Sequence, residues 1–466
     1  MNRKKFLQLS IWTPLALIMQ PLKSWSIDTP AFASNENVLY YKKGDAAYEL
    51  LRNGFNKRIN KYPRVIAKCL NEKGVAEAIL LAKQNRLSIA VKSSGHCMEG
   101  FSCNNDGMVI NLSELNTIEW LNEETVRVGP ACTLSMLYAA LLPKHKIIPG
   151  GSCAGVAIGG LTLGGGYGLL SRKFGLTCDS LKSVNMVDGK GQLHTGSANS
   201  NLLWACKGGN NGNFGVVTAL TFTLHQAPPT MQSFKFRAYK LDTARARNIL
   251  KNWFEWTKLL PPQCFSAFVL NRNTAYVLLT NTGELTPSTK KFIDAMKSIS
   301  DKSTNTTKMP LQAALKNYYG RQYPLYFKNA SAGLYKGFSD IEGCIDEVIQ
   351  QVHATNGMIF QINTLGGNIQ NPAFESNAAF AHRSYTYFSE LQTYWDQPAQ
   401  QKKCMDSFQK VQALIAGNGV TAQYRNYPDV LFSNWANAYY GKNYNRLVDM
   451  KKLYDPENVF KFEQSI

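Results

Sequence analysis

Residues 151–168 read GSCAGVAIGGLTLGGGYG, a glycine-dense run with one cysteine, Cys153, near its start. Glycine-rich turns in nucleotide-binding proteins bring bare backbone amides close to phosphates, because no side chain stands in the way. A thiol in such a turn is either a small packed hydrophobe or a group that reacts with the bound ligand. The stretch therefore raises the question of what the turn holds and whether Cys153 bonds to it.

A second glycine-bearing turn ends the strand that we expect at 87–93. It reads KSSGH, and its residues are Lys92, Ser93, Ser94, Gly95 and His96. Small residues and free amides suit a turn that holds an anion. The dinucleotide fingerprint GxGxxG requires an acidic residue about 20 positions further on, at a strand end. GGGYG at 164–168 fits that fingerprint poorly and Asp179 falls in an expected loop, so a nicotinamide site of the Rossmann type is not expected.

His96 and Cys153 each have a modest interpretation when they are taken alone. A lone histidine after a strand is more often a hydrogen-bonded structural residue, and a lone cysteine is more often a small hydrophobe. Two nucleophilic side chains in two separate glycine turns are harder to attribute to packing. Together they favour one ligand that both turns hold.

Short strands and helices are mixed in the first half of the chain, without a sustained βαβ repeat. Strands are predicted within 63–70, 87–93, 107–115, 125–134 and 213–225, helices at 72–85 and 133–142, and a hairpin at 180–195. The proline-rich QAPPT at 226–230 marks a domain boundary. Beyond it, strands are predicted at 231–240, 264–271, 274–281 and 357–367, and helices at 244–260 and 339–355. Strands set apart from helices predict an antiparallel sheet with helices on one face. The last segment, from 424, is aromatic and turn-rich.

The net charge is +19, from 51 Lys and Arg against 32 Asp and Glu. Such an excess suggests a nucleic-acid partner, but the charges are scattered and no base-reading motif occurs. We therefore interpret them as a solvated basic surface, with attraction of anionic substrates or cofactor phosphates as the alternative, and expect no nucleic-acid partner. Ten cysteines without a CxxC motif or repeated spacing predict no metal site and leave room for one or two disulfides.

The N-terminus resembles an export signal. Residues 1–33 contain a basic start, a short apolar stretch interrupted by proline, and the small-x-small ending Ala31-Phe32-Ala33. The apolar stretch is too short for a confident membrane span. Arg3-Lys4-Lys5-Phe6-Leu7 resembles a one-arginine variant of the twin-arginine motif, and a Sec signal or an uncleaved anchor is the alternative. The protein is expected to be periplasmic or secreted, with no stable membrane span after processing.

Five linked motifs carry a resemblance to a known family. They are KSSGH, GSCAGVAIGG, GGGYGLLSRKFGLTCDSL, NLLWACKGGNNGNFGVVT, and the C-terminal YRNYPD with YYGKNYNRLVDMKKLYDPENVFKFEQSI. In this order, from about residue 63 to the end, the chain resembles the berberine bridge enzyme-like family of FAD-linked oxidases. That family has the PCMH-type FAD domain of vanillyl-alcohol oxidase relatives.

The resemblance implies FAD attached at two points. His96 would bond through its ring nitrogen to the flavin 8α-methyl group, and Cys153 through sulfur to C6, while the glycines allow the backbone to approach the isoalloxazine and the pyrophosphate. The cofactor-binding residues that it implies are Lys92, Ser93, Ser94, Gly95, His96, Gly151, Cys153, Val156, Gly159, Gly160, Gly164, Gly165, Gly166, Tyr167, Gly168, Gly215, Val216, Val217, Tyr424 and Asn426.

The resemblance also implies the reaction, in which hydride passes to flavin N5 while an O–H proton leaves. Tyr427 stands where carbohydrate-oxidising relatives place the base, with Tyr424 beside it, and packing of these aromatic rings is the alternative. A tyrosinate requires a pKa well below about 10, so positive charge or hydrogen bonds must lie nearby. Gln361 and Asn363 are expected to face the substrate. Asn363 stands where some sugar oxidases carry an Asp, so this residue brings no charge.

Three positions bear on the reactivity of the flavin. Val156 occupies the position where relatives that react with oxygen carry Val, which favours an oxidase that makes hydrogen peroxide. Leu161 replaces the usual His, so one hydrogen bond to the ribityl chain is absent, and Lys92 replaces the usual Arg.

The chain is thus predicted to be an α+β, two-lobe FAD-linked oxidase. Residues 34–228 with 429–466 would form the FAD-binding domain, and 229–428 an antiparallel-sheet substrate domain. The substrate is a carbohydrate, another alcohol or a phenolic, with molecular oxygen as acceptor, and Tyr385 and Tyr387 could stack on its ring or simply pack. The alternatives are an oxidase of an aromatic metabolite, an electron-transfer or dehydrogenase flavoprotein with poor oxygen reactivity, and a basic binding protein without flavin.

Overall fold

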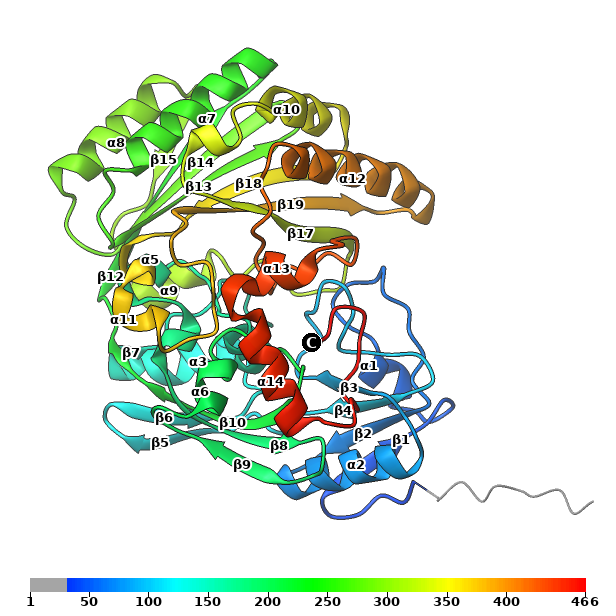
Figure 1. Ribbon diagram of the computed structural model, residues 1–466. Coiled ribbons are helices and arrows are strands. Elements are labelled where there is room, and N and C mark those ends of the chain that lie inside the picture. The colour runs from blue at the N-terminus through cyan, green and yellow to red at the C-terminus, as the bar shows by residue number, and fades with distance from the viewer. Residues whose placement is uncertain (1–31) are drawn as a thin grey trace, which may run out of the picture. The chain divides into compact units, whose positions relative to one another are not determined.

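A computed structural model describes residues 32–466, and the proposed export signal lies outside the described residues except for its last two (Figure 1). The first sheet has the order β1-β2-β4-β3. Its strands are β1 (Val38–Tyr41), β2 (Val65–Cys69), β3 (Ile89–Lys92) and β4 (Met108–Asn111), with helices α1 (Tyr48–Arg52) and α2 (Glu72–Gln84). Asn71 caps α2 by accepting a hydrogen bond from Gly74 N, and the residues at helical spacing Val75, Ala78, Ile79 and Ala82 are buried.

The second sheet is antiparallel, in the order β5-β6-β10-β8-β9. Its strands are β5 (Ile118–Asn122), β6 (Thr125–Val128), β8 (Leu181–Asp188), β9 (Leu193–Gly196) and β10 (Gly215–Thr223). The helices of this region are α3 (Leu134–Leu141), α4 (Ile158–Leu163), α5 (Ser171–Phe174) and α6 (Asn201–Cys206), and β7 (Lys146–Ile147) pairs with β11 (His225–Gln226). The glycine-dense stretch 151–168 runs through α4 and the turns on both sides of it.

The third sheet, the large sheet, is antiparallel with eight strands. Its strands are β12 (Thr230–Ala238), β13 (Cys264–Asn271), β14 (Thr274–Asn281), β15 (Lys302–Asn305), β16 (Met309–Pro310), β17 (Tyr326–Tyr335), β18 (Met358–Thr364) and β19 (Tyr387–Trp395). Helices α7 (Thr243–Thr257), α8 (Pro287–Ser298), α10 (Ile345–Ala354) and α12 (Gln401–Gly417) all cover one face (Figure 1). The short helices α9 (Leu311–Lys316) and α11 (Pro372–Glu375) lie outside this layer.

The other face of the large sheet is turned toward the glycine turns. Side chains of a strand alternate between faces, and β19 shows both environments. Tyr387 packs with Trp253 and Phe254 in the helix-side core, whereas Phe388 packs against Tyr424 and Tyr427. The free face thus presents its side chains to the motif-bearing segments.

The C-terminal segment returns to the first half of the chain. Helices α13 (Trp435–Tyr440) and α14 (Tyr444–Tyr454) follow YRNYPD, and Phe460 forms a parallel β-bridge with Ile89, the first residue of β3. Lys451 of α14 donates hydrogen bonds to the carbonyls of Asn213 and Phe460. The last segment is thereby packed onto the region that carries the glycine turns.

The predicted α+β class and the antiparallel sheet with helices on one face are confirmed. The expectation that the segment after 424 is turn-rich was wrong for α13 and α14, and β17 and β19 were not anticipated. Residues 33–466 form one compact unit, and the predicted domain boundaries stay a prediction. All ten cysteines lie in the described part and none is in a disulfide. Within 32–466, no group of side chains is arranged to hold a metal ion and no helix has the length and hydropathy to cross a bilayer.

Candidate functional site

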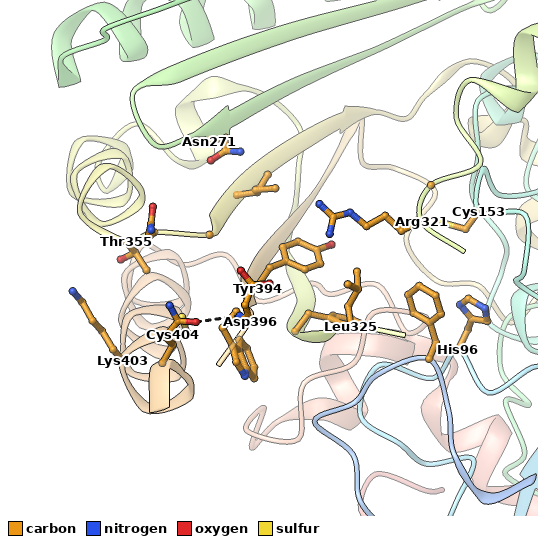
Figure 2. Close-up of a pocket in the computed structure, with 18 of the residues that line it drawn as sticks. His96, Cys153, Asn271, Arg321, Leu325, Thr355, Tyr394, Asp396, Lys403 and Cys404 are labelled. Carbon is orange, nitrogen blue, oxygen red and sulfur yellow. Dashed lines mark hydrogen bonds between the residues drawn. The ribbon is translucent and has the colours of Figure 1, made fainter. Parts of the chain in front are cut away.

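A cavity of about 1010 Å³ lies between the two glycine turns and the ends of the large sheet's strands. His96 and Cys153 lie together at one end, and Thr355 and Lys403 lie at the other (Figure 2). Tyr394 of β19 contributes to the wall between the two ends. The structure therefore brings both predicted nucleophiles to one space.

The two glycine turns are in direct contact. The amide of Ala157 donates a 2.9 Å hydrogen bond to Oγ of Ser94, which joins the KSSGH turn to the cysteine turn. A Cβ on Gly155 would lie 3.1 Å from Nε2 of His96, so glycine at this position leaves room for the imidazole. His96 therefore packs against Gly155, which lies two residues after Cys153 in the chain.

His96 is a partly buried, neutral imidazole. Its ring stacks on Phe55, with ring centroids 4.5 Å apart. Burial lowers the pKa of His96 to about 4, because the charged form loses its hydration. At neutral pH the ring nitrogen thus keeps the lone pair that a bond to carbon requires.

Cys153 presents its thiol to the cavity. The residue is exposed, yet the surrounding walls raise the pKa of the thiol, and the Glu390 carboxylate raises it further, while a hydrogen bond from Ser152 acts in the opposite direction. The thiol is therefore accessible to a ligand and protonated at neutral pH in the chain alone.

Lys92 does not point into the cavity. Its ammonium group donates hydrogen bonds to the carbonyls of Leu51 and Asn53 at the end of α1. Burial lowers the pKa of Lys92 to about 8. The role of Lys92 in this structure is to fasten the KSSGH turn to α1, and its assignment as a cofactor contact stays a prediction. Ser93 lies in the same turn between Lys92 and Ser94.

The second motif region and the C-terminal motif are fastened together by hydrogen bonds. The hydroxyl of Tyr424 accepts hydrogen bonds from Gly166 N and Tyr167 N at 3.1 and 3.2 Å. Asn426 donates from Nδ2 to the Leu161 carbonyl and to the Tyr424 hydroxyl. Burial raises the pKa of Tyr424 to about 12. Tyr424 therefore fixes the glycine turn and is not placed as a base.

Most glycines of the 151–168 stretch are required by close packing. A Cβ on Gly164 would lie 2.0 Å from Oδ1 of Asn426, and one on Gly168 would lie 1.8 Å from the Gly150 carbonyl oxygen. Close packing of the same kind surrounds Gly159, Gly165 and Gly166, whereas Gly151 has ordinary contacts. Gly160 differs, because a Cβ there would meet nothing within 4 Å.

The remaining cofactor candidates lie in the protein core. Val156 packs against the core that α3 and the second sheet share. Gly215, Val216 and Val217 are buried in β10, where a Cβ on Gly215 would lie 2.5 Å from Sδ of Met186. None of these four lines the cavity in this structure.

Tyr427 lies in an aromatic cluster with Tyr424 and Phe388, with ring centroids 5.3 Å from each. Burial and the Glu390 carboxylate raise the pKa of Tyr427 well above 10. Among the described residues, no positively charged group acts on Tyr427 to stabilise a tyrosinate. The expected lowering of the pKa of Tyr427 was therefore wrong for the chain alone, and its contact with substrate stays a prediction.

Glu390 is the functional candidate that sequence reasoning missed. It is a buried carboxyl on the free face of β19, and burial raises its pKa above the usual 4.5. Asn329 donates a 3.1 Å hydrogen bond to its Oε2. Its charge acts on both Tyr427 and Cys153. The available signal was an acidic residue at an inward position of the aromatic-rich strand YFSELQTYW.

Gln361 and Asn363 belong to the same polar group. Gln361 stands directly opposite Glu390 in the β18–β19 ladder, and its Nε2 donates a 2.8 Å hydrogen bond to Oδ1 of Asn363. Asn363 in turn donates to the Glu390 carboxylate. Asn363 thus brings no charge of its own but holds the residue that does. For Tyr387, the sequence left open whether it stacks on the substrate ring or packs in the protein. The structure places it in the helix-side core, with its hydroxyl 2.9 Å from that of Thr257.

The residues present fit an FAD molecule. The space above Gly160 is open, and the adjacent Asn211 has a buried Oδ1 that no described group satisfies. Nδ2 of Asn211 bonds to the Gly160 carbonyl and to Asn426. An orphaned buried acceptor beside an open glycine suits a hydroxyl donor such as those of a ribityl chain. Attachment of FAD through neutral His96 and accessible Cys153 stays a prediction.

Comparison with known proteins gives matches along most of the chain. A family model described as FAD binding domain matches residues 63–197, and one described as Berberine and berberine like matches residues 423–466. The uncharacterized FAD-linked oxidoreductase YgaK of Bacillus subtilis (strain 168) is 30% identical over 436 residues, which are 91% of this chain and 95% of that protein.

Solved structures share the fold. The BBE-like 1 protein of Physcomitrella patens superposes with a TM-score of 0.85 at 24% identity, over 92% of this chain and 96% of that one. A chitooligosaccharide oxidase superposes with a TM-score of 0.84 at 23% identity, over 92% and 97% of the two chains. The two-lobe architecture predicted from the motifs is confirmed by these likenesses.

Proposed function

Because this chain belongs to the berberine bridge enzyme-like family of FAD-linked oxidoreductases, we propose that it is an exported oxidase with FAD attached through both His96 and Cys153. It oxidises a hydroxyl-bearing small molecule, with oxygen as the electron acceptor and hydrogen peroxide as product. The observation that carries this proposal is the meeting of His96 and Cys153, from two separate glycine turns, at one end of one cavity. Export rests on the signal-like residues 1–33 alone.

FAD, when bound, supplies the acceptor for a hydride from the substrate carbon and the route of two electrons to oxygen. His96 holds it through a neutral imidazole and Cys153 through a thiol that opens into the cavity. Asn211 offers its unsatisfied Oδ1, and Gly160 leaves room above α4. Attachment at two points prevents loss of the cofactor outside the cytoplasm.

Glu390 receives the proton of the substrate hydroxyl. A carboxyl with a raised pKa is a base near neutral pH, whereas the pKa of Tyr427 lies too high for that residue to be ionised. Tyr427 contributes a hydroxyl that contacts the reacting hydroxyl and passes its proton to Glu390. Gln361 and Asn363 hold the Glu390 carboxylate in place, because Asn363 donates a hydrogen bond to Glu390 and accepts one from Gln361.

The far end of the cavity favours a carbohydrate over a phenolic substrate. Its walls include the amide, hydroxyl and carboxyl groups of Asn271, Thr355, Asn356, Asp396 and Gln400, together with the indole of Trp395. Amide groups beside an indole suit a ring that carries several hydroxyls.

The proposal is tested on the purified protein by its absorbance before and after acid denaturation. We expect flavin to stay with the precipitated wild-type chain, to stay in His96→Ala and in Cys153→Ala, and to be released from the double variant. Peroxide release is then measured with a panel of mono- and oligosaccharides and a panel of phenolics. Flavin release from the wild-type protein would contradict the two attachments. Flavin that no donor reduces would indicate an electron-transfer protein, and reduction without peroxide a dehydrogenase.

A further inference from the structure

One buried ammonium group connects the loops that carry the candidate site residues. Lys328 of β17 is 1% exposed, and its Nζ pairs with Oδ1 of Asp429 at 2.8 Å and with Oε1 of Glu99. The side chains of Glu99 and Asp429 are each 2% exposed. Arg58 pairs with the other oxygen of Glu99 at 3.1 Å, so two cations face two anions in the interior. We call these four residues the Lys328 cluster.

The cluster joins segments that are far apart in sequence. Glu99 follows His96 by three residues, and Asp429 follows Tyr427 by two. Lys328 itself stands between Phe327, which lines the cavity, and Asn329, which donates to Glu390. One ammonium group is thus bonded to the loop of the proposed flavin attachment and to the loop of the proposed substrate contact, next to the residue that orients the proposed base.

Further bonds of the cluster act on the same loops. Gln412 of α12 reaches Asp429 at 3.5 Å and the Ser331 carbonyl at 2.9 Å, while Ser331 N donates to the Tyr427 carbonyl at 2.9 Å. Arg58 also donates to the carbonyls of Met98 and Phe327. The cluster therefore fixes backbone as well as side chains on both sides.

Stability alone is a poor explanation for this arrangement. Burying charges costs hydration, and well-packed apolar side chains of similar size would stabilise a fold as well or better. Buried pairs act strongly over short distances, however, so they specify one arrangement of the groups they join. The connection made by Lys328 is between site loops, where separation controls reactivity.

We propose that Lys328 is a positioning residue that sets the separation of the His96 loop (residues 92–99) and the Tyr427 loop (residues 424–429). The proposal rests on the proposed function, in which the first loop holds the flavin and the second meets the substrate. Without Lys328, Asp429 loses its cationic partner and Glu99 keeps only Arg58, so the two buried carboxylates repel each other and the two loops move apart.

The test compares Lys328→Met with Lys451→Met. Lys451 is a matched control, because it is a nearly buried lysine that bonds to two carbonyls and pairs with Asp455 at 2.8 Å outside the two loops. Amide hydrogen exchange reports both loops without reference to activity. We expect faster exchange in residues 92–99 and 424–429 together in Lys328→Met, and in neither loop in Lys451→Met.

Kinetics give a second readout. With any donor that reduces the wild-type flavin, we expect Lys328→Met to slow flavin reduction about 10- to 100-fold, because misplacement by about 1 Å has effects of that size. The apparent Kd of the donor should change by less than about threefold. Lys328→Arg, which keeps the charge, should recover most of the rate, and a merely structural loss would not show this split.

Two single-carboxylate variants decide the case if Lys328→Met fails to fold. Glu99→Gln should loosen only residues 92–99, and Asp429→Asn only residues 424–429. Equal exchange in Lys328→Met and Lys451→Met, or loosening of both loops by either carboxylate variant, would overturn the proposal. A wild-type flavin that no donor reduces would defeat the proposed function, while the exchange result would still decide the role of Lys328.

Discussion

Burial shifts the proton equilibria of the candidate site in directions that separate the tasks of its residues. It lowers the pKa of His96 to about 4, so the imidazole is neutral over the physiological range. It raises the pKa of Glu390 above 4.5 and that of Tyr427 well above 10. A carboxyl therefore remains the strongest base candidate, and the tyrosine remains a neutral donor.

Glu390→Gln tests this assignment through the pH dependence of flavin reduction. Since a base acts when deprotonated, the wild-type rate should fall as the pH is lowered through the raised pKa of Glu390. Glu390→Gln should reduce the rate at neutral pH by about 100-fold or more. It should also remove the fall of the rate at low pH, which we call the acidic limb of the pH profile. Stopped-flow reduction across the pH range measures both effects.

Tyr427→Phe is the matched variant, because it removes only a hydroxyl from the same cluster. It should slow reduction and leave the acidic limb in place. An acidic limb that survives Glu390→Gln and disappears in Tyr427→Phe would assign the base to Tyr427 instead.

At the scale of elements, the short helix α4 and its flanking turns show two kinds of glycine. Gly164 and Gly168 are required by neighbouring protein atoms, at 2.0 and 1.8 Å from a hypothetical Cβ. Gly160 in α4 has no such neighbour. The uncrowded Gly160 beside the unsatisfied Asn211 acceptor leaves room for the proposed cofactor at this point.

Gly160→Ala separates these two reasons. Alanine in a helix is favoured over glycine by about 0.5–1 kcal/mol, so the chain should be no less stable. The flavin content of the purified protein should nevertheless fall, because the methyl group enters the space proposed for FAD. Flavin absorbance per chain and thermal unfolding are the two measurements.

Gly417→Ala provides the control, since Gly417 also has no neighbour within 4 Å of a Cβ and ends α12. It should keep full flavin content. Equal flavin content in the two variants would place the cofactor elsewhere.

At the scale of the whole molecule, the cavity is assembled from segments of both halves of the chain. The reactive end comes from the glycine turns, and the far end from the hairpin end at Asn271, the turn before β18 and the first turn of α12. Trp395 is 5% exposed at this far end, and its indole N–H has no hydrogen-bond partner among residues 32–466. An unpaired donor in a polar wall suits a substrate long enough to reach it.

Trp395→Phe should therefore raise KM for long substrates while kcat changes little. The loss of one hydrogen bond of about 1 kcal/mol corresponds to roughly a fivefold effect. Glucose and its β-1,4-linked oligomers are suitable probes, with peroxide release as the assay. A KM that rises equally for glucose would show that Trp395 acts at the reactive end or on folding.

The sequence alone was sufficient for features that depend on local backbone demands. The glycine spacing of KSSGH and of residues 151–168 predicts two turns, because it expresses steric requirements of the backbone, and the structure brings the two turns into contact. That these turns hold a ligand stays a prediction. Periodicity placed α2, α7 and the β13–β14 hairpin. It did not reveal α14, because the aromatic and charged residues of this segment are also typical of a loop. The helix is recognised only from the packing of its buried residues in the tertiary structure.

The sequence by itself thus determined the α+β class, the family and the pair His96 and Cys153, since these depend on short motifs in a fixed order. Only the tertiary structure decided that Glu390 lies beside Tyr427, and that Lys328 joins Glu99 to Asp429. The reason is physical, because strand register and burial create surroundings of low dielectric constant. These surroundings raise the pKa of Glu390 and strengthen the ion pairs that Lys328 forms with Glu99 and Asp429. Those surroundings are supplied by residues that lie from tens to more than two hundred positions away along the chain.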